Sequence, residues 1–203
     1  MQAVMTASKG PKRAARRGPR RATPRYLRNA ALHYLERYAS SAAHLRRLLL
    51  VKVERSARAH DTDRAAGAAA VDALIGELTA LGLLDDARYA EAKARALHRR
   101  GASARAIRAA LATKGVAPNT IATALDALSE SEPEPELSAA LRYARRRGLG
   151  PYRPPDSRAA MRQRDLAALG RRGFDYEVAR RVIEARRARD IESEAGTGHG
   201  TLT

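Results

Sequence analysis

The sequence predicts an all-α fold built from repeated helical units. Leucines recur at helical spacing, as at Leu74, Leu78 and Leu81, and glycines follow such runs where helices are expected to end. The same order of signals returns along the chain: a serine that can cap a helix, an apolar residue four positions later, and a closing glycine. This recurrence indicates a surface that is repeated along the molecule.

The first 25 residues differ from the rest in charge and composition. They contain eight Lys and Arg and no acid, together with several Pro and Gly, in a chain whose net charge is +17. Such a segment cannot bury enough apolar surface to order itself. We therefore expect residues 1–25 to form a disordered basic arm, able to neutralise phosphates with an affinity that falls as salt rises.

The first helical unit is expected at residues 26–84. Ser41, Leu45 and Leu49 match the serine and apolar signals of the later units. Lys52 stands where those units have a glycine, so we expect an insertion at about residues 53–69.

The connection into the second unit contains a dense group of signals. Gly82 is suited to end a helix, and Leu83 and Leu84 are expected to be buried by folding back. Asp85 or Asp86 can cap the next helix, because a short carboxylate accepts free N–H groups at a helix start.

The second unit is expected at residues 85–130. Tyr89 begins a thin apolar stripe with Ala92, Ala96 and Leu97, and its ring is expected to pack under the preceding connection rather than contact a partner. Ser103 can start the next helix, which ends at Gly115, and a further helix follows from Pro118.

The third unit is expected at residues 137–187. Residues 131–136, acidic and broken by proline, are predicted to be an extended spacer. Gly173 and Phe174 repeat the glycine and apolar pair that closes a middle helix, which is longer here than in the second unit. Residues 188–203 lack periodicity and are expected to be a mobile tail.

The motifs resemble those of a known family. The run from Gly82 to Ala90, the triplet Lys114-Gly115-Val116 and the run from Arg171 to Tyr176 resemble the RecX family of bacterial recombination regulators. The resemblance implies three tandem three-helix units in an elongated, curved body. It also implies binding in the groove of the RecA nucleoprotein filament and restraint of ATP hydrolysis, strand exchange and co-protease activity in DNA repair. The motif positions are Gly82, Leu83, Leu84, Asp85, Asp86, Tyr89, Gly115, Gly173 and Phe174.

Rows of cations are the candidate partner-binding residues. They can be solvated helix faces, or they can face acidic protein or nucleic acid, to which the planar arginine fork binds in bidentate fashion. The candidates are Arg99, Arg100, Arg105, Arg108, Lys114, Arg145, Arg146, Arg147, Arg171, Arg172, Arg180 and Arg181.

Other classes of function find little support in the sequence. The chain has no cysteine, no apolar run of membrane-spanning length, and no catalytic or metal-ligand spacing. We therefore expect a cytoplasmic, monomeric protein that is not an enzyme and needs no cofactor or metal. Two alternatives stay open: a general basic DNA-binding module with weak, salt-dependent affinity for single- or double-stranded DNA, and a helical scaffold for another protein.

Overall fold

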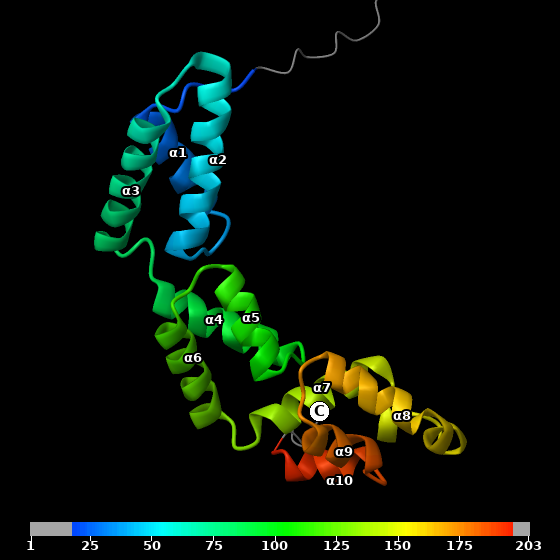
Figure 1. Cartoon of the computed structure of the whole chain (residues 1–203). Coiled ribbons are helices and arrows are strands. Elements are labelled where there is room, and N and C mark those ends of the chain that lie inside the picture. The colour runs from blue at the N-terminus through cyan, green and yellow to red at the C-terminus, as the bar shows by residue number, and fades with distance from the viewer. Residues whose placement is uncertain (1–17, 197–203) are drawn as a thin grey trace, which may run out of the picture.

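The computed structural model describes residues 18–196, and most of these residues are helical. It contains ten α-helices, one short 3-10 helix and no β-strand among these residues, so the all-α prediction is confirmed. Figure 1 shows three helical bundles following one another along a curved path. Parts of the predicted arm, residues 1–17, and of the predicted tail, residues 197–203, lie outside the described residues.

The first bundle consists of helices α1 (Pro24–Leu35), α2 (Ala42–His60) and α3 (Arg64–Ala80). Its core includes the fully buried Leu27 and Leu78. Packing of such leucines, more than helix propensity, stabilises short helices in water.

The insertion predicted at residues 53–69 does not form a separate segment in this bundle. Residues 53–60 continue α2, a turn follows at Asp61, and α3 begins at Arg64. No glycine or proline interrupts residues 42–60, so the helix runs through Lys52 and buries Val53 on the same face as Leu49. The extra residues lengthen two helices instead of forming a separate segment.

The arm predicted to extend to residue 25 is shorter than expected. Ala22 is buried in the first core, and its backbone N–H donates to Ser56 Oγ at 2.8 Å. Thr23 then caps α1, where it accepts from the Tyr26 N–H. Residues 22–25 therefore belong to the folded bundle.

The second bundle consists of α4 (Asp86–Arg99), α5 (Ala104–Thr113) and α6 (Pro118–Ser131). The stripe predicted on α4 is correct at Tyr89 and Leu97, which pack against the core. It is wrong at Ala92, which is exposed, because the buried alanines are Ala90 and Ala94. Tyr89 lies half-buried at the edge of the core.

The third bundle consists of α7 (Pro135–Arg147), the 3-10 helix η1 (Gly150–Tyr152), α8 (Pro155–Arg171) and α9 (Tyr176–Glu184). The middle helix α8 has 17 residues against 10 in α5, in line with the longer helix expected there.

The tail predicted from residue 188 begins with a packed helix. Helix α10 (Ala188–Glu194) places Ile191 in the third core, and Ala195 follows it there. The Tyr152 hydroxyl donates to Glu192 Oε1 at 2.6 Å, which fixes the helix to η1. A single isoleucine in seven residues is too weak a pattern to predict such packing from sequence.

A repeated joint connects the first and second bundles. The Ser41 hydroxyl, which caps α2, donates to the Lys114 carbonyl at 2.6 Å. The next N–H of the same helix, that of Ala42, donates to Asp86 Oδ1 at 2.8 Å. The following bundle thus supplies both a carbonyl and a carboxylate to the N-terminus of α2, which carries partial positive charge.

The second joint repeats this arrangement with equivalent residues. The Ser103 hydroxyl, which caps α5, donates to the Arg172 carbonyl at 2.8 Å, and the Ala104 N–H donates to Glu136 Oε1 at 2.6 Å. Burial raises the pKa of Glu136, an effect opposed by the Ala104 N–H. The same geometry at two places explains why the bundles follow one another in a regular way.

A glycine at each joint allows the close approach. Gly115 and Gly173 have φ angles of +79° and +88°, which residues with a side chain rarely adopt. A Cβ at Gly115 would lie 2.6 Å from Ala43 Cβ, and one at Gly173 would lie 2.8 Å from Ser103 Oγ. These glycines are therefore needed for both the turn and the contact between bundles.

The acidic residues predicted as an extended spacer instead tie two bundles together. Glu136 caps α5, and Glu132 pairs with Arg142 at 2.8 Å. His98 on α4 donates from Nε2 to the Pro135 carbonyl at 2.7 Å. The spacer prediction is wrong because Glu136 and Glu132 have neighbours on the second bundle, the Ala104 N–H and His98 Nδ1, that only the fold brings close to them.

Replacing Ser103 by Ala tests the second joint. We expect a loss of about 1–2 kcal/mol in unfolding free energy for the cap, and about 1 kcal/mol more for the lost bond to the Arg172 carbonyl. Urea unfolding followed by circular dichroism measures both.

Thr23→Ala is the matched control, since Thr23 caps α1 through the Tyr26 N–H alone. Equal losses in the two variants would contradict an energetic role for the inter-bundle bond.

Candidate functional site

An arginine-lined groove of about 600 Å³ lies between α7 and α8 of the third bundle. Its floor contains Tyr143, Leu149, Met161 and Ala168. Six arginines line it: Arg146, Arg147, Arg153, Arg164, Arg171 and Arg172.

One carboxylate of the groove is already bound within the protein. Asp165 is buried and accepts from Arg153 Nε at 2.7 Å, Arg153 Nη2 at 2.8 Å and the Gly150 N–H at 2.9 Å. Burial opposes ionisation of Asp165, but the Arg153 guanidinium and the Gly150 N–H hold its pKa below the ordinary value. Arg153 is therefore fixed in position by a bidentate pair.

Five of the six groove arginines lack a carboxylate partner, and the side chains of three of these five also make no hydrogen bond or ring contact within residues 18–196. Among residues 18–196, no carboxylate lies within ion-pair distance of Arg147, Arg164 or Arg171. Clustered cations with a shared concave surface raise the local concentration of anions. The groove can bind carboxylates or phosphates, and nothing in it points to a reaction.

The groove adjoins the second joint. Arg146 and Arg172 lie against the Tyr143 ring, with guanidinium carbons 5.8 and 5.1 Å from its centroid. Arg146 also donates to the Arg100 carbonyl on the second bundle at 2.6 Å, and the Arg172 carbonyl accepts from Ser103. The shape of the groove therefore depends on how the two bundles meet.

The predicted partner-binding residues of the third bundle are divided between several faces. Arg146, Arg147, Arg171 and Arg172 come together in the groove. Arg145 lines a separate hollow beside Glu192. Arg180 pairs with Glu177 and Glu184, and Arg181 with Glu134 and Glu194, so their charge is largely neutralised within the protein.

The predicted residues of the second bundle also have different surroundings. Arg99, Arg100 and Arg108 are exposed, and the aliphatic part of Arg105 lies beside Gly173 at the joint. Lys114 donates from Nζ to His44 Nε2 at 3.3 Å. Burial, then the charges of Lys114 and Arg47, lower the pKa of His44. Lys114 thus takes part in the first joint.

Several motif residues cap helices or pack in the cores of the bundles. Asp85 caps α4 by accepting from the Arg88 N–H, whereas Asp86 caps α2 of the preceding bundle. Leu84 is buried, but Leu83 is 52% exposed, so the prediction that both fold inward is wrong for Leu83. Burial raises the pKa of Tyr89, and Phe174 belongs to the third core.

Arg153 and Arg164 were not singled out by the sequence. Arg164 stands seven residues, or two helical turns, before Arg171 on α8, so helical spacing predicts that both share a face. Arg153 lies in a proline-rich loop, and only the fold brings it to Asp165.

Residues 18–196 contain no candidate metal site and no candidate membrane span. No three His, Asp or Glu side chains among residues 18–196 lie close enough to hold a metal ion. No helix in that range is long and apolar enough to cross a membrane.

Comparison with known proteins identifies the family. Residues 85–125 match the family model described as RecX, second three-helix domain. The chain is 43% identical to the regulatory protein RecX of Myxococcus xanthus over 74% of its own length and 80% of that protein's. The chain belongs to the RecX family.

Other RecX proteins show the same likeness. The regulatory protein RecX of Halorhodospira halophila is 34% identical over 79% of this chain and 88% of its own length. That of Agrobacterium fabrum is 35% identical over 55% and 59%. No solved structure gives a significant match. The relatives of this RecX-family chain are thus named as regulatory proteins, a class that is not an enzyme family.

Replacing Asp165 by Asn tests the support of the groove. We expect a loss of about 2 kcal/mol in unfolding free energy near neutral pH, because a charged bidentate bond is weakened. The pKa of Asp165 is lowered in the folded protein, so this stabilisation is present above the unfolded pKa and is lost as pH falls through the folded pKa.

The difference between the two proteins should therefore be smaller at about pH 3 than at about pH 7 in urea unfolding. Asp126→Asn, at an exposed position of α6, is the control and should change little at either pH. A pH-independent difference would contradict the ionic origin of the effect.

Proposed function

We propose that this chain is a regulatory protein that binds the RecA nucleoprotein filament and inhibits its ATP hydrolysis, strand exchange and co-protease activity. The observation that carries the proposal is the groove with three unpaired arginines, Arg147, Arg164 and Arg171, on tandem bundles of a RecX-family chain. A protein filament on DNA offers both carboxylates and phosphates to such a groove.

The mechanism that we propose is mechanical restraint. A filament that hydrolyses ATP at subunit boundaries must change the spacing of its subunits. A protein that contacts two subunits at once binds the filament more tightly at one subunit spacing than at another. It therefore raises the free energy needed to change that spacing. The bonded joints at Ser41 and Ser103 support this mechanism, because they oppose bending between bundles. Inhibition then needs no chemical step from this chain.

A second candidate is a general basic DNA-binding module. The arginine groove favours it to the extent that phosphates fit the same guanidinium groups as carboxylates do. Binding of that kind is dominated by counterion release, so it weakens steeply with salt and does not require RecA.

Charge reversal in the groove tests the proposal. Arg147, Arg164 and Arg171 replaced together by Glu should raise the concentration needed for half-inhibition of RecA ATP hydrolysis by about tenfold or more, because three attractive contacts become repulsive. The helix content measured by circular dichroism should not change, since all three side chains are exposed.

The matched control reverses Arg25, Arg88 and Arg187, with the same change in net charge. These are three exposed arginines outside the groove that have no ion-pair partner in the described part of the chain. Equal loss of inhibition in both variants would show that total charge, and not the groove, is responsible.

Deletion of residues 1–17 separates the two candidates. The deletion stops there because Ala22 belongs to the first core. A filament regulator should keep most of its inhibition of RecA, whereas a DNA-binding module should lose most of its DNA affinity with eight basic residues reduced to three. ATPase titration and DNA binding at two salt concentrations measure the two effects. Loss of inhibition in proportion to DNA affinity would favour the DNA-binding module.

A further inference from the structure

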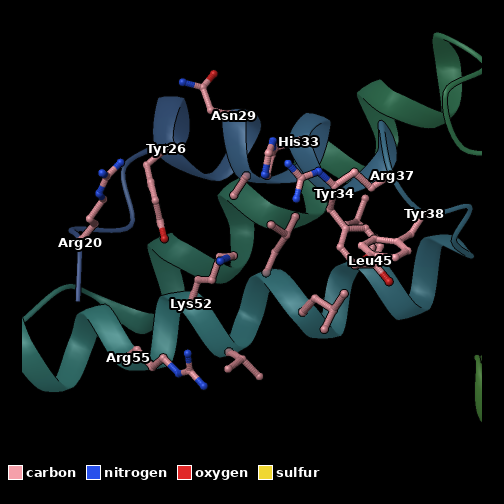
Figure 2. Close-up of a pocket in the computed structure, with 14 residues that line it drawn as sticks. Arg20, Tyr26, Asn29, His33, Tyr34, Arg37, Tyr38, Leu45, Lys52 and Arg55 are labelled. Carbon is pink, nitrogen blue, oxygen red and sulfur yellow. The ribbon is translucent and has the colours of Figure 1, made fainter. Parts of the chain in front are cut away.

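A second groove, of about 700 Å³, lies between α1 and α2 of the first bundle (Figure 2). Its floor is aliphatic and includes Ala30, Leu45, Leu48 and Leu49. Cations surround it: Figure 2 shows Lys52 and Arg55 on α2, Arg20 on the loop before α1 and Arg37 just after α1. It belongs to a different bundle from the arginine groove.

The groove is open because α1 packs on α2 less extensively than α3 does. Two large apolar side chains that line it are left in water, Tyr38 with 58% and Val51 with 48% of their surface exposed. Contiguous exposed apolar surface of this kind marks interaction sites in folded proteins.

Among the described residues, Arg and Lys side chains of α1 and α2 pair with acids on the side toward α3 but not on the side toward the groove. Toward α3, Arg28 pairs with Glu77 at 2.6 Å, and Arg46 pairs with Asp72 at 2.5 Å. Toward the groove, no Asp or Glu belongs to the lining.

The four groove cations, Arg20, Arg37, Lys52 and Arg55, have no carboxylate within ion-pair distance among the described residues. The groove therefore combines an apolar floor with an uncompensated positive rim.

We propose that this groove binds an acidic amphipathic helix of a partner protein. Apolar residues at positions i, i+4 and i+7 of that helix fit the aliphatic floor, and Asp or Glu beside them pair with the rim cations. Helix α1, which forms one wall, is 12 residues long and offers contact over about three turns. The site is separate from the arginine groove and does not depend on the filament proposal.

The surroundings of the tyrosines favour a helix over single-stranded nucleic acid. Bases bind such grooves by stacking on free aromatic faces. Tyr34 already packs against Tyr38 and His44, with ring centroids 5.2 and 6.4 Å apart, and Lys52 Nζ lies 5.8 Å from the centroid of Tyr26. The remaining floor is aliphatic, which suits leucine and isoleucine side chains.

Fluorescence anisotropy with the full chain tests the proposal. The probe is a labelled helical peptide of about 15 residues, with leucines on one face and glutamates on the other. Its control is a peptide of the same composition with the leucines scattered. We expect the amphipathic peptide to bind about tenfold or more tightly than the scattered one, and to bind more weakly as salt rises.

Two substitutions locate the binding. Val51→Asp and Arg55→Glu should each lower the affinity for the amphipathic peptide by about fivefold or more. Both positions are exposed, so the variants should still fold. Leu81→Asp and Arg187→Glu introduce the same charges at exposed positions outside the groove and should leave the affinity unchanged.

Three results would overturn the proposal. One is equal affinity for the two peptides, and another is an affinity that neither Val51→Asp nor Arg55→Glu reduces. The third is that the peptide does not bind, whereas a labelled oligothymidine binds and both variants weaken its binding. That result would assign the groove to nucleic acid.

Discussion

The shared capping of two helix N-termini is the interaction on which the arrangement of the bundles depends. The first N–H groups of any helix lack partners within it and carry partial positive charge. In α2 and α5 one such group is satisfied by a carboxylate of the next bundle, Asp86 or Glu136. Burial raises the pKa of Glu136, and the hydrogen bond from the Ala104 N–H opposes that effect. If a bundle turns away, these protein hydrogen bonds at the helix end are lost and must be replaced by bonds to water.

The interactions that stabilise each bundle differ from those that join it to the next bundle. Each has its own core, whereas the joints contain a few hydrogen bonds and a glycine that permits close approach. Arg146 and Arg172 belong at once to the arginine groove and to the second joint, through the Arg100 carbonyl and the Ser103 hydroxyl. The contact between bundles therefore fixes Arg146 and Arg172 at one edge of the groove, beside the three unpaired arginines.

Arginine content alone says little about where this protein binds. Arg180 and Arg181 look equivalent to Arg171 in the sequence, yet acids of α9, α10 and the α7 start pair with them. Exposed pairs of this kind contribute little to stability, but they remove charge from the surface. Two groups of unpaired cations line concave surfaces, one in the α7–α8 groove and one in the α1–α2 groove, whereas others, such as Arg99 and Arg108, lie singly on exposed helix faces.

Local signals in the sequence were enough to predict the helices, because a capping serine such as Ser103 and an apolar period such as Ile107 to Leu111 act within one or two turns. They also predicted that Arg171 and Arg172 lie on a positive surface. The packing of α10, the exposure of Leu83 and the pairing of Glu132 and Glu136 depend on residues far away in the chain. Only the tertiary structure decided these, since a charged or apolar side chain has no fixed role until its neighbour in space is known.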